Sequence, residues 1–163
     1  MLHTKVNYEV VFMTTEKKVI LIVDDEIHIV EILKTMLTPF VDAIFTAYNG
    51  LEALNLVKKH PEIDVILSDI KMPVMDGMTF IKNAREAKID KPFIFFTGYG
   101  SEQYMMDALK YGAFDFLNKP HFESLEEIVL KALNHAKKTN SSSKQDRETI
   151  TAYQKLIKSK RAE

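Results

Sequence analysis

The sequence contains no cysteine and no long hydrophobic segment. The absence of cysteine excludes disulfide bonds and thiolate metal sites, and it is consistent with a reducing compartment. The longest unbroken apolar run covers residues 19–23, far short of the roughly 20 residues that a transmembrane helix needs. Residues 1–18 also lack the apolar stretch and the small-residue cleavage site of a signal peptide. We therefore expect a cytoplasmic protein that does not contact a membrane.

The formal net charge of -1 hides an uneven distribution of charge along the chain. Residues 138–163 carry seven Lys or Arg against three acids, a net charge of +4. Residues 1–18 have a net charge of +1, which leaves -6 for residues 19–137. An acidic central part argues against direct nucleic-acid binding by that part. We interpret the basic segment as a solvated extension, with contact to an acidic partner or to nucleic acid as the alternative.

Five short apolar runs alternate with five segments of helical periodicity. The expected strands are 19–23, 42–47, 63–67, 92–96 and 113–117. The expected helices are 26–38, 51–59, a helix after Gly77, 101–111 and 123–137. This alternation predicts an α/β fold of the (βα)5 type, a doubly wound five-stranded parallel sheet covered by helices on both faces. In the first helix the spacing predicts one buried face, made of Ile27, Val30, Ile32, Leu33 and Leu37.

One domain, residues 18–137, accounts for most of the chain. Residues 1–17 are interpreted as an N-terminal extension, in which Met13 is a plausible natural start. Residues 138–163 are interpreted as a basic linker or tail, with 138–144 as a flexible linker. The segment 145–160 has Ile150, Tyr153, Leu156 and Ile157 at helical spacing, so it is either a docked helix or a frayed tail.

Polar side chains follow four of the expected strands. Asp24 and Asp25 come after the first strand, Asp69 after the third, Thr97 after the fourth and Lys119 after the fifth. In an open parallel sheet, ligands bind beyond the carboxyl ends of the strands. We therefore expect three carboxylates, a hydroxyl and an ammonium group to meet in one crevice.

Such a cluster needs a cation or a proton. Two like charges about 4 Å apart repel by about 4 kcal/mol at an effective dielectric constant near 20. An all-oxygen site without cysteine or clustered histidine suits Mg²⁺. A carboxylate can also attack phosphorus to give an aspartyl phosphate, and a metal ion then offsets the charge of the phosphoryl oxygens. Lys119 can supply a positive charge and Thr97 a hydroxyl for those oxygens.

Four motifs carry a resemblance to a known family. They are Asp24-Asp25-Glu26, Ser68-Asp69-Ile70-Lys71-Met72-Pro73-Val74-Met75-Asp76-Gly77, Phe96-Thr97-Gly98 and Gly112-Ala113-Phe114-Asp115-Phe116-Leu117-Asn118-Lys119-Pro120. In this order, each at a strand end, they resemble the response-regulator receiver domains of two-component signalling. The resemblance covers residues 18–137 and implies a CheY-like, flavodoxin-like sheet with strand order 2-1-3-4-5.

The resemblance also implies a role for each residue of the predicted crevice. Asp69 would accept the phosphoryl group, and Lys119 and Thr97 would contact it. Asp25 and Asp69 would ligate Mg²⁺, or Mn²⁺ as a substitute, directly, and Asp24 usually through water. The backbone carbonyl of Lys71 would complete the protein ligands. The peptide bond between Lys119 and Pro120 would be cis.

Three further positions follow from the same resemblance. Phe116 would be the aromatic switch residue, whose ring turns inward when Thr97 moves. Lys71 and Tyr99 would tune autodephosphorylation by admitting or blocking water, and their bulk suggests a slow rate.

A receiver of this kind accepts its phosphoryl group from a histidine kinase or a phosphotransfer protein. It then reshapes the face made by helix 101–111, strand 113–117 and helix 123–137, through which it controls a protein partner or dimerises. It is not an enzyme, apart from catalysing its own phosphorylation and dephosphorylation.

Other readings stay open. Asp24 and Asp25 alone would suit a helix N-cap, and Thr97 and Phe116 alone would be ordinary strand and core residues. A haloacid-dehalogenase-type phosphohydrolase would need an acid at position 71, where this chain has Lys71. The chain could also be an unphosphorylated interaction module, or a receiver fragment of a larger regulator whose output domain is missing. The five His have no metal-binding spacing, and Met105 and Met106 suit either a contact surface or one core and one solvent position.

Overall fold

Runs of β-branched and aromatic residues form a five-stranded parallel sheet in the computed structural model, which describes residues 17–140. The strands are β1 (Val19–Val23), β2 (Ala43–Ala47), β3 (Val65–Ser68), β4 (Phe93–Thr97) and β5 (Asp115–Asn118). Their order is β2-β1-β3-β4-β5, and every neighbouring pair is parallel. The predicted (βα)5 fold and strand order 2-1-3-4-5 are therefore confirmed.

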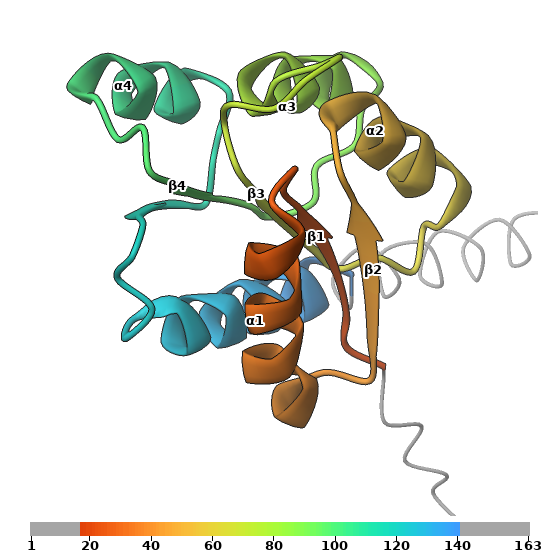
Figure 1. The fold of residues 1–163 in the computed structure, drawn as a ribbon. Helices are drawn as coiled ribbons and strands as arrows, with labels where there is room; N and C mark the ends of the chain where they lie inside the picture. The colour runs from red at the N-terminus through yellow and green to blue at the C-terminus, as the bar shows by residue number, and fades with distance from the viewer. Residues whose placement is uncertain (1–16, 141–163) are drawn as a thin grey trace, which may run out of the picture.

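Helices connect the strands and cover both faces of the sheet (Figure 1). They are α1 (Ile27–Leu37), the short 3₁₀ helix η1 (Thr38–Phe40), α2 (Gly50–Lys59), α3 (Gly77–Glu86), α4 (Glu102–Lys110) and a C-terminal helix over residues 125–140. Side-chain caps fix the starts of three of them, since Asn49, Asp76 and Ser101 each accept a hydrogen bond from a backbone N–H in the first turn.

The two faces of the sheet carry separate apolar cores. On one face, Ile20 and Ile22 of β1 pack with α1 and the C-terminal helix. On the other face, Leu21 and Val23 pack with α2, α3 and α4 (Figure 1). β1, β3 and β4 are buried on both faces, which explains why their sequences are continuously apolar.

Some of the predicted details are wrong. Ile27 and Ile32 are 62% and 44% exposed, so they do not belong to the buried face of α1, which consists of Val30, Leu33 and Leu37. Ile32 lies two residues after Val30 and therefore points about 200° away around the helix. Ile27 begins the first turn, next to the exposed residues 26 and 28. The expected strands 63–67, 92–96 and 113–117 begin one or two residues too early.

The C-terminal helix also differs from its predicted range, 123–137. It starts at residue 125 and continues to 140, into the segment predicted as a flexible linker. Ala136 extends its buried face, and Thr139 donates a hydrogen bond to the His135 carbonyl, 3.1 Å away. Met13, residues 1–16 and the segment 145–160 lie outside the described residues. Within residues 17–140, no helix has the length and apolar character needed to cross a membrane.

Candidate functional site

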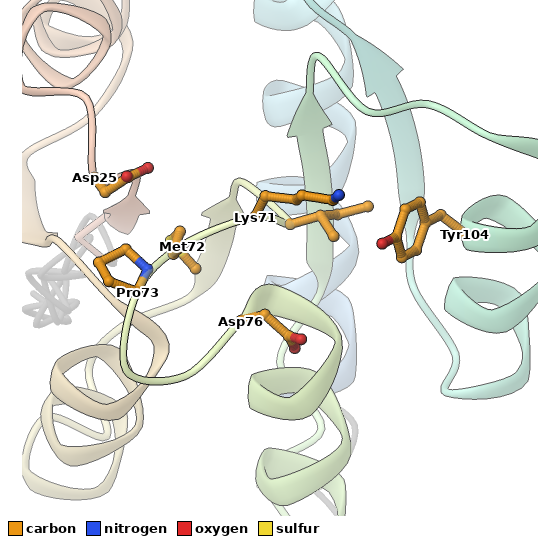
Figure 2. A pocket seen from close by; sticks show the side chains of 7 residues that line it. Asp25, Lys71, Met72, Pro73, Asp76 and Tyr104 are labelled. Atoms are coloured by element: carbon orange, nitrogen blue, oxygen red, sulfur yellow. The ribbon is translucent and has the colours of Figure 1, made fainter.

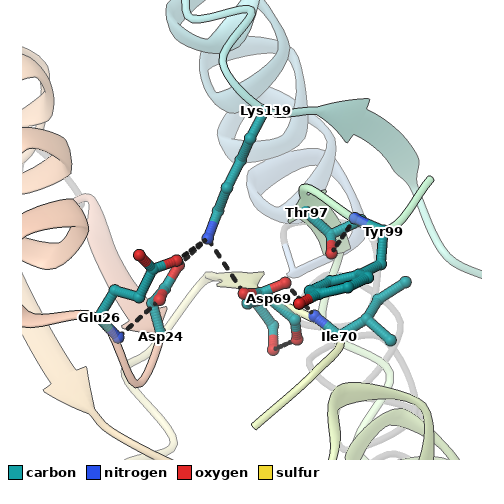
Figure 3. Close-up of polar contacts among 8 residues, drawn as sticks. Asp24, Glu26, Asp69, Ile70, Thr97, Tyr99 and Lys119 are labelled. Atoms are coloured by element: carbon teal, nitrogen blue, oxygen red, sulfur yellow. Dashed lines mark hydrogen bonds and ion pairs between the residues drawn. The ribbon is translucent and has the colours of Figure 1, made fainter.

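The fold brings the predicted polar residues to the carboxyl edge of the sheet. Asp24 and Asp25 directly follow β1, Asp69 follows β3, Thr97 ends β4 and Lys119 follows β5. β1, β3 and β4 are adjacent in the sheet, and β5 lies next to β4. Figure 3 shows Lys119 reaching across this edge towards Asp24 and Asp69.

Lys119 forms ion pairs with three carboxylates at this edge. Its Nζ lies 2.7 Å from Asp24 Oδ2, 3.0 Å from Asp69 Oδ2 and 3.3 Å from Glu26 Oε1. The second oxygens of the two aspartates accept backbone hydrogen bonds, Asp24 Oδ1 from Glu26 N at 2.9 Å and Asp69 Oδ1 from Ile70 N at 2.6 Å. Both carboxylates are thus held in fixed orientations.

Burial raises the cost of charge in this cluster. Asp24 and Asp69 are 1% and 4% exposed. Burial raises the pKa of Asp24 above its usual value, although hydrogen bonds from Lys119 and Glu26 act in the opposite direction. Burial alone would lower the pKa of Lys119, but hydrogen bonds and charge from Asp24 and Asp69 outweigh it and raise that pKa. Lys119 is therefore firmly cationic.

The acidic residues suit a divalent cation. Asp24, Asp25 and Asp69 each offer a carboxylate oxygen, and these three atoms all lie within 4.8 Å of one another. Asp25 is exposed, so the group is open to solvent on one side. Three carboxylates against one ammonium leave an excess of negative charge. An open, all-oxygen group of this kind matches the ligand preference of Mg²⁺.

The loop after β3 packs tightly beneath Asp69. Gly77 N donates to the Ile70 carbonyl at 2.7 Å, and a Cβ at Gly77 would lie only 2.1 Å from the Asp69 carbonyl oxygen. Any side chain here would displace the backbone of Asp69, so position 77 requires glycine. In the same loop, Val74 is 78% exposed and has a φ of 67°, in the left-handed region that β-branched residues avoid.

Thr97 and Tyr99 lie on the opposite side of Asp69 from Asp24 and Glu26 (Figure 3). Thr97 is fully buried, and its Oγ1 accepts a hydrogen bond from Tyr99 N at 3.2 Å. Its carbonyl accepts from Lys119 N at 2.8 Å, which ties the ends of β4 and β5 together. The Lys71 ammonium lies 4.6 Å from the centre of the Tyr99 ring, so the two residues form a cation–π pair across the site.

Phe116 is partly buried, with its ring centre 5.9 Å from that of Phe95. The predicted cis peptide between Lys119 and Pro120 is confirmed. Met105 and Met106 are 41% and 52% exposed, so neither is in the core and the alternative of one core position is wrong.

A hollow adjoins the acidic residues. It has a volume of about 500 Å³ and is lined by Asp25, Ile70, Lys71, Met72, Pro73, Asp76 and Tyr104. Figure 2 shows Asp25 on the segment after β1, Tyr104 in the first turn of α4, and the other labelled side chains on the loop between β3 and α3. The hollow gives Asp25 access to an incoming molecule.

Two site residues were not singled out by the sequence. Glu26 is the third acid that reaches Lys119, and its only signal was its place directly after the acidic pair. The sequence pattern placed Gly77 only within a motif and before a helix, because it does not show how closely this residue approaches Asp69.

The fold and site define an α/β signalling domain with an acidic pocket and an opposed lysine. The sequence profile of the response regulator receiver domain matches residues 20–131. The chain therefore belongs to the response regulator receiver domain family, a family of signalling modules rather than catalytic enzymes. Receiver domains act together with histidine kinases and downstream partners.

Similar proteins agree with this family. The chain is 34% identical to the transcriptional regulatory protein ZraR of Salmonella typhimurium over 75% of this chain and 28% of that protein. It is 40% identical to the regulatory protein AtoC of Escherichia coli over 70% of this chain and 25% of that protein. It is 36% identical to the response regulator SaeR of Staphylococcus aureus over 71% of this chain and 49% of that protein. The chain thus spans about a quarter to a half of these relatives.

Solved structures show the same architecture. A receiver domain from Clostridium thermocellum is 30% identical, with a TM-score of 0.68 over 74% of this chain and 97% of that one. A CheY-like receiver from Methanospirillum hungatei is 28% identical, with a TM-score of 0.70 over 76% of this chain and 98% of that one. The CheX–CheY–BeF₃–Mg²⁺ complex from Borrelia burgdorferi contains a chain that is 36% identical to this one. Their TM-score is 0.64, over 71% of this chain and 86% of that chain.

Proposed function

We propose that this chain is a phosphorylation switch in which Asp69 accepts a phosphoryl group from a histidine kinase or a phosphotransfer protein. The observation that carries the proposal is the geometry at Asp69, whose side chain is buried next to two further carboxylates and bonded to Lys119. This combination pairs a nucleophile with groups suited to hold a metal ion and a phosphoryl oxygen.

The transfer is a displacement at phosphorus. A carboxylate oxygen of Asp69 forms a bond to the phosphorus, and the bond from phosphorus to the donor breaks. For a phosphohistidine donor the electron pair of the P–N bond stays on the imidazole nitrogen, which takes up a proton. Lys119 stabilises negative charge on the phosphoryl oxygens, and the Thr97 hydroxyl donates a hydrogen bond to one of them.

A magnesium ion is the expected cofactor, and Mn²⁺ would substitute for it. Asp24, Asp25 and Asp69 would hold it together with the backbone carbonyl of Lys71. When bound, the ion offsets the negative charge of the phosphoryl oxygens. The similarity to a chain of the Borrelia CheX–CheY complex, which was solved with BeF₃ and Mg²⁺, supports this assignment.

Phosphorylation would act through Thr97 and Phe116. When Thr97 turns towards the phosphoryl group it vacates space, and the Phe116 ring moves inward. The face formed by α4, β5 and the C-terminal helix then changes shape and engages a protein partner or a second copy. A cytoplasmic location, where such a domain would meet its donor, is part of this proposal.

The Lys71–Tyr99 pair would set the lifetime of the phosphorylated state. The two side chains meet across the site, 4.6 Å apart, and so restrict the approach of a hydrolytic water to Asp69. We expect slow autodephosphorylation for this reason.

The test is phosphoryl uptake from acetyl phosphate or phosphoramidate, followed by intact mass with and without Mg²⁺. We expect a gain of one phosphoryl group that depends on Mg²⁺ and is absent from the Asp69→Asn variant. Asp76→Asn is the matched control, because Asp76 is exposed, lines the adjoining hollow and caps α3 through an oxygen that asparagine keeps. Full uptake by Asp69→Asn, or none by the unaltered chain beside an active receiver, would refute the proposal.

A second candidate is a constitutive interaction module that is never phosphorylated. Absence of uptake together with retained partner binding would favour it. Because the chain spans only part of its curated relatives, it could also serve as the receiver of a larger regulator with a separate output domain.

A further inference from the structure

The outer side of α4 carries an apolar surface that the described residues leave uncovered. Ala108 is the only buried residue of α4, whereas α1, α2 and α3 bury three or four each. Met105, Met106 and Leu109 are 41%, 52% and 62% exposed. Met105 and Leu109 line a hollow of about 180 Å³, together with Ala108 and residues 113–116. We call this hollow the α4–β5 groove.

One acidic residue lines the α4–β5 groove, and two more lie on α4. Glu102 and Asp107 lie on α4, and Asp115 lies on the groove wall. Of these, Asp107 pairs with Lys110 at 2.9 Å. The groove therefore favours an occupant with apolar side chains and a positive net charge.

The chain itself contains such a segment after residue 140. Residues 141–163 carry six Lys or Arg against three acids, and 145–160 place Ile150, Tyr153, Leu156 and Ile157 at helical spacing. A helix of this length is marginal in water, so its apolar side requires a surface to pack against.

The C-terminal helix passes close to the groove. The His135 ring on this helix contacts the ring of Phe114, a groove residue, with 5.6 Å between the ring centres. From His135 to residue 140 the helix rises only about 7.5 Å. Residues 141–144, if extended, span about 14 Å before the segment begins. The segment 145–160 can therefore reach the groove of its own chain.

We propose that residues 145–160 occupy the α4–β5 groove of the same chain, with Tyr153 and Leu156 against Met105 and Leu109. The docking itself is independent of phosphorylation. Its regulatory consequence rests on the proposed function, because the groove belongs to the face through which a phosphorylated receiver would engage a partner. The segment then competes with that partner and lowers its affinity.

Disulfide trapping tests the proposal cleanly, because the chain has no cysteine of its own. The full, unphosphorylated chain carries Leu109→Cys with Tyr153→Cys, and the control carries Lys82→Cys, on an exposed position of α3, with Tyr153→Cys. Under mild oxidation at high dilution, we expect the Leu109 pair to close within one chain at least tenfold faster than the control. Equal rates would overturn the proposal, and disulfide-linked dimers would assign the groove to a second copy.

Hydrogen exchange of α4 gives an independent readout without cysteine. Leu156→Asp should speed exchange of the α4 amides several-fold by removing the docked segment. Thr151→Asp adds the same charge on the opposite side of the expected helix and should leave the exchange unchanged. Equal effects of both substitutions, or none from either, would refute the docking. Neither experiment involves phosphoryl transfer, so its failure would be distinct from failure of the proposed function.

Discussion

Arg85 near the end of α3 joins two loops of the domain, the one between α3 and β4 and the one between α4 and β5, through backbone carbonyls. Its Nε donates to the Tyr111 carbonyl at 3.0 Å, Nη1 donates to Ile89 at 2.6 Å and Lys91 at 3.1 Å, and Nη2 donates to Gly112 at 3.1 Å. These bonds join the end of α3 to the start of β4 and to the end of α4. We predict that Arg85→Ala destabilises the domain by about 3 kcal/mol.

The magnitude follows from the burial of the bonds. A hydrogen bond from a charged donor contributes about 1.5–3 kcal/mol, and water can replace it only where it is exposed. The bonds from Arg85 to Tyr111, Ile89 and Lys91 are partly buried, and the bond to Gly112 is exposed. Because the three buried bonds share one guanidinium group, their contributions do not add fully, which gives about 3 kcal/mol. Arg85→Lys keeps the charge but lacks the planar fork, so we expect a loss of about 2 kcal/mol.

Urea unfolding of the unphosphorylated chain measures this loss. The urea concentration at the unfolding midpoint should fall. The slope of the unfolding free energy against urea concentration should stay unchanged, because the substitution alters stability and not the surface exposed on unfolding. Lys82→Ala, at an exposed position of the same helix, is the control and should change stability by less than about 0.5 kcal/mol. A loss below about 1 kcal/mol for Arg85→Ala would refute the reasoning.

Three further predictions concern the loop after β3 and the acidic site. Val74→Gly should raise the free energy of unfolding by about 1 kcal/mol, since relief of about 1–3 kcal/mol of left-handed strain exceeds the added entropy of the unfolded chain; a lower urea midpoint would contradict this. Mg²⁺ at about a hundred times its dissociation constant should stabilise the chain by about 2.7 kcal/mol. In thermal-shift titrations, Asp25→Asn should weaken Mg²⁺ binding at least tenfold, whereas Asp76→Asn should not. Gly77→Ala should destabilise the domain by about 2 kcal/mol and weaken Mg²⁺ binding, because its Cβ would displace Asp69; unchanged melting would show that the loop adapts.

Much of the fold could be predicted because its signals are local. The run Val19–Val23 is apolar at every position, and this alone indicates a strand buried on both faces. The alternation of such runs with helical spacing then restricts the sheet to parallel connections. Helix ends and side-chain exposure were less predictable, because they depend on where the sheet stops. Ile27 has helical spacing with Val30, yet it is exposed in the first turn of α1.

In the candidate site, too, some features could be predicted from local sequence and others could not. Asp24, Asp25, Asp69 and Lys119 were identifiable because each directly follows a strand, and parallel strands end at one edge. The contact of Glu26 with Lys119 was not identifiable, because it joins residues 93 positions apart and depends on the side-chain path of a lysine.

The sequence by itself determined the parallel α/β fold, the edge of the sheet that carries the polar residues and the chemistry those residues can perform. These features depend on the order and type of residues along short segments. Tertiary structure alone decided that Asp24 and Asp69 share one ammonium group, that Gly77 lies against the Asp69 backbone and that Lys71 stacks on Tyr99. Such contacts depend on packing distances of a few ångströms between distant segments, which residue patterns do not encode.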